Sequence, residues 1–345
     1  MRAIIRSADL ESDRRQLIGF FREHLNPAFD EPRFDWMYLR NPYGRASAWL
    51  LFDNENKRLI GAAAAFPRRL RAKGKEASGY VLGDFCIHPL ARTLGPALQL
   101  QRACLDGITA GSEGAWYDFP SDSMTAIYSR LGKAPQTKFV RWAKPLRVDR
   151  ALASKVKGKT LRGALRAVAN LVLRTNDSVR RGAHKLEIRG QKGPCGDEFT
   201  RLGAEAEKPH EICVVNTAEY LNWRFLAHPS QGFDILTARN GSVLAGYLIL
   251  AQEGDDARIA GLRSRDEDSA RALCGAASDA MRSAGAMTLS ASLVEGDARA
   301  EVLKKLGFRP REGRSVIFQG PAKSEAQSGN GGKMHWHLMD GDRDA

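Results

Sequence analysis

The sequence predicts an α+β fold built from two related units, each with a mixed, mostly antiparallel sheet flanked by helices. A segment repeats, since residues 35–42 read DWMYLRNP and residues 222–229 read NWRFLAHP, with an offset of 223 − 36 = 187 between their tryptophans. After each copy, two β-prone runs flank a polar turn, which is typical of an antiparallel hairpin. The 345 residues accommodate two units at roughly 150 residues per domain. Because Trp36 and Trp223 hold the same place in both copies, we interpret them as core residues. The alternative is that they stack on a sugar or line the groove of another ligand.

The first copy continues with a strand and a helix. Its hairpin runs are 48–52 and a run that ends at Gly61, and a strand is expected at 80–87. Apolar residues then recur at helical spacing, which makes residues 92–96 a strand-to-helix turn. The helix positions are Ala97, Leu100, Cys104 and Ile108.

Each copy also ends a helix in the same way. Residues 129–133 read SRLGK and residues 304–308 read KKLGF. We expect Gly132 and Gly307 to adopt the left-handed conformation that closes a helix and that other residues resist.

The turn at 92–96 has the properties of an anion site. Backbone N–H groups at a helix start have no intrahelical partner, and the helix dipole favours negative charge there. Gly95 lets a ligand approach the main chain closely. A phosphate or pyrophosphate would be the natural occupant.

Most of residues 1–146 resembles the GNAT superfamily of N-acetyltransferases. Arg92, Gly95 and Ala97 fit its RxxGxG/A signature, and GDFCIHPLA at 83–91 resembles its fourth strand. The segment AIYSRLG at 126–132 resembles the later Tyr-x-x-x-Gly-Phe motif, with Lys133 in place of the usual Phe. The two-unit arrangement resembles GNAT proteins associated with bacterial exopolysaccharide and cell-envelope biosynthesis.

The resemblance implies acetyl-CoA as co-substrate and direct attack of an amine on its thioester. The main chain at Cys86 and Ile87 would pair with the pantetheine arm. The turn would hold the pyrophosphate through Arg92, Thr93, Leu94, Gly95, Pro96 and Ala97.

Three side chains are candidates for moving protons. Asp84 is the first candidate for the general base and Asp118 the second, and either could act through water. Asp84 has an alternative interpretation as a carboxylate satisfied by neighbouring backbone N–H groups. Tyr128 would donate a proton to the departing thiolate, and its alternative role is helix packing.

The second copy, residues 195–320, is expected to be degenerate. At the expected helix start it carries Asp266, Glu267 and Asp268. These carboxylates already satisfy the helix dipole and would repel a pyrophosphate. This unit is expected to shape a substrate cleft or an interface.

A basic amphipathic segment, residues 147–194, joins the units. Residues 144–192 hold 14 basic and 3 acidic side chains, 14 − 3 = +11 of the chain's net +13. Two interpretations remain open: a linker helix that packs its apolar stripe on a neighbouring domain, or peripheral contact of residues 147–192 with an anionic membrane. The stripe is Leu161, Leu165, Val168 and Val172. No aromatic residue follows Trp142 in the basic run, so nucleic acid binding is not expected.

The C-terminal residues 321–345 are expected to be a flexible tail that ends in a docked strand. Residues 321–332 are rich in Ser, Gly and Lys. A short strand carrying Trp336 is favoured over a metal site at His335 and His337, because nothing fixes a ligand geometry there. No metal is therefore expected.

Composition excludes several classes of protein. The 43% hydrophobic and 27% charged residues are typical of a folded globular chain. No run of eighteen apolar residues occurs, so we expect a cytoplasmic protein, with the inner membrane face as a peripheral site. The five cysteines form no CxxC pair and are interpreted as reduced, buried thiols.

The sequence thus predicts an N-acetyltransferase acting on a small or carrier-linked amine, with an amino sugar of envelope polysaccharide synthesis as the leading acceptor. One alternative is transfer of another acyl group. The other is a non-catalytic, membrane-docking or regulatory protein with the same fold.

Overall fold

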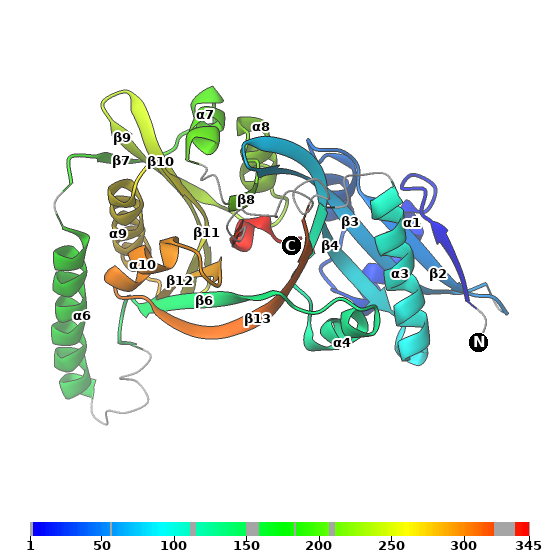
Figure 1. Ribbon diagram of the computed structural model, residues 1–345. Coiled ribbons are helices and arrows are strands. Elements are labelled where there is room, and N and C mark those ends of the chain that lie inside the picture. Colours follow the sequence, from blue (N-terminus) through cyan, green and yellow to red (C-terminus); the bar gives the residue numbers. More distant parts are fainter. Residues whose placement is uncertain are drawn as a thin grey trace.

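The structure is a computed structural model that describes residues 3–55, 57–110, 115–149, 159–182, 184–206, 211–320 and 335–344 (Figure 1). The elements of the first half are β1 (Ala3–Ser7), α1 (Arg14–His24), α2 (Glu31–Phe34), the π-helical turn η1 (Asp35–Leu39), β2 (Ser47–Asp53), β3 (Leu59–Ala72), β4 (Lys75–Ile87), the 3-10 turn η2 (Pro89–Ala91), α3 (Leu94–Ala110), β5 (Ala115–Asp118), α4 (Asp122–Arg130) and β6 (Thr137–Pro145).

The second half begins with the helix of the basic segment. Its elements are α6 (Lys159–Arg181), β7 (Glu187–Gly190), α7 (Asp197–Glu205), β8 (Glu211–Val214), α8 (Ala218–Leu221), the π-helical turn η3 (Asn222–Leu226), β9 (Asp234–Asn240), β10 (Val243–Glu253), β11 (Asp256–Ser264), α9 (Glu267–Ser283), β12 (Thr288–Val294), α10 (Arg299–Lys305), β13 (Arg309–Gln319), β14 (His335–His337) and the 3-10 turn η4 (Asp340–Asp342).

The described strands form one mixed sheet that runs through the whole molecule. Its order is β1-β2-β3-β4-β5-β13-β6-β12-β11-β10-β9-β7, and β8 joins through β3 and carries β14. The expected hairpins form, because β2 pairs with β3 and β9 pairs with β10, both antiparallel. The expected end of the second strand is wrong, since β3 continues past Gly61 to Ala72 and β10 continues past Gly246 to Glu253. β7, inside the segment expected to be a linker, is instead an edge strand beside β9.

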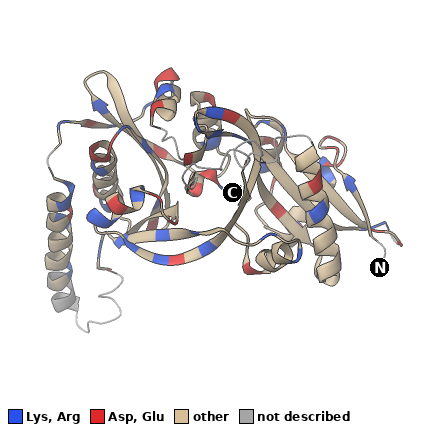
Figure 2. Ribbon diagram, viewed as in Figure 1, with Lys and Arg blue, Asp and Glu red and all other residues tan. Residues whose placement is uncertain are grey.

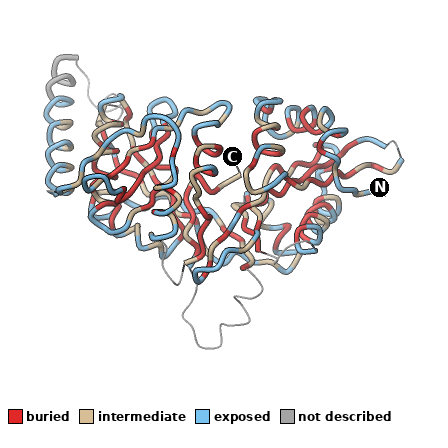
Figure 3. Tube along the Cα trace, turned by 90° about the horizontal axis from the view of Figure 1, so that it is seen from above, coloured by how far each residue is buried: buried red, intermediate tan, exposed pale blue. Residues whose placement is uncertain are grey.

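Helices cover both faces of each half of the sheet, because successive strand residues point to opposite sides. In β2, Leu51 packs under α3 and α4, whereas its neighbour Leu50 packs under α1 and η1. In the second half, α9 and α10 cover one face, and α7 and α8 cover the other. Figure 3 shows the buried residues gathered along this sheet.

Two strands cross between the halves. β6 follows α4 but lies between β13 and β12, and β13 follows α10 but lies between β5 and β6. Figure 2 shows basic residues along both crossing strands. Each half of the sheet therefore contains a strand that the other half supplies.

The repeated sequence segment forms the same structure twice, and the two copies meet. Each copy is a short helix that continues into a π-helical turn. The N-cap of the helix is Asp30 in the first copy and Thr217 in the second, again separated by the repeat offset, 217 − 30 = 187. Trp36 Nε1 donates to the Trp223 carbonyl at 2.8 Å, and Trp223 Nε1 donates to the Trp36 carbonyl at 3.0 Å. The rings stack with centroids 5.2 Å apart. Both side chains are buried, which confirms them as core residues.

Several other sequence predictions are confirmed. Gly132 and Gly307 have φ of +73° and +88° at the ends of α4 and α10. All five cysteines are buried, and none of them forms a disulfide. Trp336 lies on β14, which pairs with β8, and its side chain is buried. The predicted flexible stretch 321–332 lies outside the described residues.

The expectation that α6 packs its apolar stripe on a neighbouring domain is wrong. Val168 and Val172 are 62% and 55% exposed, whereas Asp177 on the opposite side of the helix faces the protein. Polar contacts hold α6 in place, so Val168 and Val172 remain in solvent. The side chain of Leu161, the first residue of the predicted stripe, lies outside the described residues. In the part of the chain that the structure describes, no helix combines the length and apolar character needed to cross a bilayer.

The paired tryptophans predict matched effects on stability. Trp36→Phe and Trp223→Phe each remove one indole donor and leave a buried carbonyl unpaired, so each should lower the free energy of unfolding by about 1–3 kcal/mol. Urea unfolding of both single variants and the double variant measures this. If one substitution costs nothing while the other is severe, the two bonds are not equivalent and this account of the junction is wrong.

Candidate functional site

Strands β4 and β5 separate at the centre of the first half. They pair in parallel only from Gly79–Ala115 to Val81–Tyr117. Beyond Val81, β4 continues to Ile87 in register with β3 alone among the described strands, and a bulge interrupts that register between Ala62 and Ala64. We call the space between β4 beyond Val81 and β5 beyond Tyr117 the first opening.

A cavity of about 780 Å³ lies at the first opening. Its walls come from the ends of β4 and β5, from α3 and α4, from β13 and from the C-terminal residues. Its charged lining residues are Asp84, Asp118, Asp122, Glu312, Arg314, Arg343 and Asp344. The formal charge of this lining is 2 − 5 = −3, in a chain of net charge +13. The cavity is thus an acidic site in a basic protein.

Asp118 lies at the end of β5, as the sequence predicts, and forms the start of a buried hydrogen-bond chain. Tyr128 Oη donates to Asp118 Oδ2 at 2.6 Å, and Gln101 Nε2 donates to Tyr128 Oη at 3.0 Å. Burial raises the pKa of Asp118 to about 7, although the bond from Tyr128 opposes this rise. A carboxyl group with this pKa is half ionised near neutral pH, which is where a general base works best.

Tyr128 is fully buried and stacks on Trp116, with ring centroids 5.9 Å apart. Its hydroxyl proton already has Asp118 as acceptor. The expected donation of a proton from Tyr128 to a departing thiolate stays a prediction. The stacking on Trp116 and the hydrogen bond from Gln101 hold Tyr128, and Tyr128 in turn positions the carboxyl group of Asp118.

Asp84 also lines the cavity but is held by two side chains. Tyr38 Oη donates to Asp84 Oδ2 at 2.8 Å, and Arg33 Nη2 lies 3.3 Å from Asp84 Oδ1. Its backbone sits at φ +46°, in the left-handed region. Burial raises its pKa above the usual value. The partners of Asp84 are therefore side chains, not the backbone N–H groups considered from the sequence. Two side chains bind Asp84, whereas among the described side chains only Tyr128 bonds to Asp118, so Asp118 is the better candidate for the general base.

The predicted phosphate turn is at the surface, where β4 leads into α3. The helix begins at Leu94, inside the expected turn at 92–96, and Arg92 Nε donates to the Ile87 carbonyl at 3.0 Å. Gly95 is exposed, and a Cβ there would meet nothing within 4 Å. Thr93 is exposed, Pro96 is half-buried and Ala97 is buried on the inner face of the helix.

Cys86 and Ile87 lie on β4 ahead of this turn, with buried side chains. Burial raises the pKa of the Cys86 thiol to about 11, so it stays protonated at neutral pH. Only the main chain of this part of β4 is available to a ligand.

The C-terminal residues reach the cavity from the second half, and Figure 1 shows this end of the chain at the centre of the molecule. Buried side chains hold their carbonyls: Arg224 Nε donates to Gly341 at 2.9 Å, and Tyr117 Oη donates to Asp342 at 2.7 Å. Asp344 then lies against Gly83 of β4, in a space that a Cβ at Gly83 would fill. The cavity is therefore completed by residues far away in the sequence.

The same C-terminal segment closes the matching space in the second half, the second opening. β11 and β12 pair in parallel as far as Ile259 and Ala291. One residue further along each strand, the C-terminal segment takes the place of the partner strand. A Cβ on Gly341 would lie 2.9 Å from the carbonyl oxygen of Ala260 in β11, and Asp340 forms a hydrogen bond with Ser292 of β12. At the start of α9, the Asp266 side chain accepts from Ser269 N at 2.7 Å and so caps the helix.

Sequence reasoning missed several residues of the site: Arg33, Tyr38, Gln101, Glu312, Arg314, Arg343 and Asp344. One signal was available, because Tyr38 stands where the second copy has Phe225, and only the first copy has an Asp84 to receive its hydroxyl. Within the described residues, no group of three His, Cys, Asp or Glu side chains is placed to hold a metal ion.

No family model matches the chain, and no curated protein matches its sequence. Its structure, however, is similar to solved structures. A GCN5-related N-acetyltransferase from Anabaena variabilis superposes with a TM-score of 0.67 at 13% identity, over 92% of this chain and 72% of that one. A probable N-acyltransferase of unknown function from Enterococcus faecalis gives 0.65 at 11% identity, with the same coverage.

N-myristoyltransferase from Saccharomyces cerevisiae, with bound myristoyl-CoA, gives a TM-score of 0.56 at 14% identity, over 92% of this chain and 80% of that one. Each superposition spans both halves of the chain. At these identities the similarity concerns the fold, so the chain has the fold of the GCN5-related N-acetyltransferases.

Proposed function

We propose that the chain transfers an acetyl group from acetyl-CoA to a primary amine, and that the first opening is the site of this reaction. The observation that carries the proposal is Asp118, a carboxyl group with a pKa of about 7 at an acidic cavity between two separating strands. The similarity of fold to N-acetyltransferases and to an acyltransferase with bound myristoyl-CoA supports it.

The residues near the first opening fit the donor. The main chain of β4 beyond Val81 has no β5 partner in the described register, so it can pair with an extended pantetheine arm. The exposed start of α3 at Leu94 and Gly95 offers backbone N–H groups to the pyrophosphate, with Arg92 beside it. The cavity itself then receives the acceptor.

The acceptor is a cation before it reacts. An ammonium group is favoured by a lining with a formal charge of −3. Asp118 accepts a proton from the ammonium, and the free amine nitrogen attacks the thioester carbonyl. The C–N bond forms and the C–S bond breaks. The thiolate takes up the second proton that the nitrogen loses, and Asp118 releases the first proton to solvent. The amine is small or carrier-linked, and an amino sugar of envelope polysaccharide synthesis is our proposed example, which rests only on the resemblance of the two-unit sequence.

We also propose that the halves are related GNAT units, 1–146 and 195–320, of which only the first binds acetyl-CoA. The repeated π-helical turns and the matching order of strands support the relationship. The C-terminal segment in the second opening and the self-capped start of α9 support the loss of donor binding.

Transfer of a longer acyl group is the second candidate. Its supporting observation is the N-myristoyltransferase similarity. The charged lining of the cavity favours acetyl, because a long acyl chain requires apolar walls. Titration with acetyl-CoA and a long-chain acyl-CoA in parallel decides between them.

Gly95 provides the test of donor binding. A side chain there has open space, and an acidic residue in the first turn favours the helix, so Gly95→Glu should fold normally. Its charge should weaken acetyl-CoA binding on the order of tenfold or more through repulsion of the pyrophosphate. Isothermal titration measures this, with the uncharged Gly95→Gln as the matched control. Equal affinities of the two variants would remove the turn from the donor site.

Asp118 provides the test of chemistry. Its pKa is raised to about 7, so the base form gains population as the pH rises, and kcat/KM should increase through pH 7 to a plateau. Asp118→Asn should lower kcat/KM on the order of a hundredfold and abolish this limb. Asp106→Asn, on the exposed side of α3, is the control and should leave the profile unchanged. If the pH dependence of kcat/KM is the same in Asp118→Asn as in the wild type, another group is the general base.

Tyr128→Phe separates a positioning role from proton donation. The hydroxyl bond lowers the pKa of Asp118, so its loss should move the midpoint of the pH profile above 7 while the plateau changes little. The pH dependence of kcat/KM measures the shift. A fall of the plateau with no shift of the midpoint would instead favour donation to the thiolate.

A further inference from the structure

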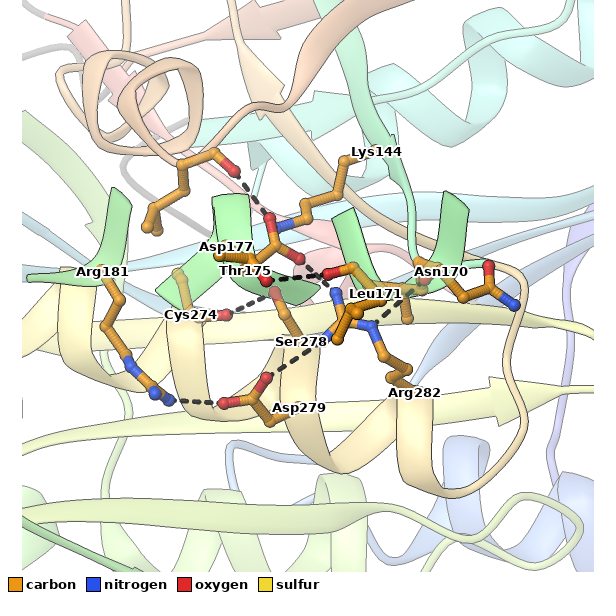
Figure 4. Close-up of polar contacts among 12 residues, drawn as sticks. Lys144, Asn170, Leu171, Thr175, Asp177, Arg181, Cys274, Ser278, Asp279 and Arg282 are labelled. Atoms are coloured by element: carbon orange, nitrogen blue, oxygen red, sulfur yellow. Dashed lines mark hydrogen bonds and ion pairs between the residues drawn. The ribbon is translucent and has the colours of Figure 1, made fainter. Parts of the chain in front are cut away.

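Helix α6 is attached to the protein by its polar face (Figure 4). Asp177 accepts from Lys144 Nζ at 2.7 Å and also pairs with Arg282 of α9, and Lys144 is buried beneath this contact. One turn further along, Arg181 pairs with Asp279 of α9 at 2.5 Å.

The middle of the helix also has such contacts. Asn170 accepts from Val148 N at 2.9 Å and donates to Asp149 at 3.0 Å. The stem of Arg181 lies on Gly275 of α9, in a space that a Cβ there would fill. The orientation of α6 on the protein is therefore specified.

The apolar residues of α6 lie on the opposite face. Val168 and Asp177 are 177 − 168 = 9 residues apart, which at about 100° per residue places them about 180° apart around the axis. The exposed fractions along this face are 42% for Leu165, 62% for Val168, 64% for Leu171, 55% for Val172 and 74% for Val179. These five are nearly half of the eleven large apolar residues that are exposed in the described chain.

The length and position of this apolar face suit a flat surface. From Leu165 to Val179 it extends about 21 Å at about 1.5 Å per residue. The helix stands at the outer edge of the molecule, beside α9, in both Figure 1 and Figure 3. The ion pairs of α6 leave from its polar side and the apolar residues opposite are exposed, so a planar partner can reach this face.

The charge of the segment identifies the partner. Lys159–Arg181 contains six basic residues and one acidic residue, 6 − 1 = +5, and the acidic one, Asp177, is used in the contact with Lys144 and Arg282. Arg174, in the middle of the helix, is exposed. An apolar stripe on a basic helix is attracted to anionic lipid head groups and inserts at their boundary with the acyl chains. A second copy of the chain would bring two such basic helices together and is disfavoured by repulsion.

We propose that α6 binds an anionic lipid bilayer, lying in the plane of the membrane with Leu165, Val168, Val172 and Val179 inserted. The ion pairs to α9 hold the helix so that the rest of the protein sits on the aqueous side. This inference does not depend on the proposed acyl transfer.

The experiment is co-sedimentation of the full chain with vesicles of phosphatidylcholine containing phosphatidylglycerol. The intact chain should bind these vesicles, and pure phosphatidylcholine or high salt should weaken binding. The double variant Val168→Ser, Val172→Ser should lower the partition coefficient on the order of tenfold, because it removes inserted apolar area. Circular dichroism and thermal melting should match the wild type, since both side chains are already in solvent.

The matched control is the double variant Ile4→Ser, Val243→Ser, which removes two exposed apolar side chains of 44% and 52% exposure from other elements and should bind as the wild type does. Failure of the wild type to bind anionic vesicles overturns the proposal. Equal binding by the α6 variant and the wild type also overturns it. So does self-association in sedimentation velocity that the α6 variant abolishes, because the stripe would then be a contact between copies.

Discussion

Each half of the sheet is completed by a strand that the other half supplies, because β6 pairs with β12 and β13 pairs with β5. Backbone hydrogen bonding makes this exchange a strong constraint, since either half alone would leave long strand edges unpaired. The exchange fixes the halves in one relative position. In that position Trp36 and Trp223 can bond to each other, and β13 can contribute Glu312 and Arg314 to a cavity of the first half.

The same arrangement explains why the two openings differ. The C-terminal segment leaves β14, fills the second opening beside Ala260 and ends with Asp344 against Gly83 at the first opening. A single segment therefore closes one site and completes the other. The buried guanidinium of Arg224 and the hydroxyl of Tyr117 fix its carbonyls, and burial lowers the pKa of Arg224 to about 10. The two openings of the repeat therefore differ in their surroundings.

Features set by local sequence were predictable, and features set by long-range contacts were not. The hairpins, the left-handed Gly132 and Gly307 and the β14 strand follow from turn residues, helix ends and alternation within a few residues. The strand exchange and the approach of Asp344 join residues that are more than a hundred positions apart, and periodicity carries no information about such pairs. The amphipathic pattern of residues 159–181 correctly predicts a helix. The orientation of α6 on the protein depends on the ion pair between Asp177 and Lys144, which a pattern of apolar residues cannot reveal.

The central claim is that the first opening alone takes an acyl-CoA. A crystal structure of the chain with acetyl-CoA tests it most directly. We expect one molecule per chain, with the pantetheine arm along β4 beyond Val81, the pyrophosphate at Leu94 and Gly95, and the thioester near Asp118. Acetyl-CoA at the start of α9, with the C-terminal segment displaced from the second opening, would contradict it.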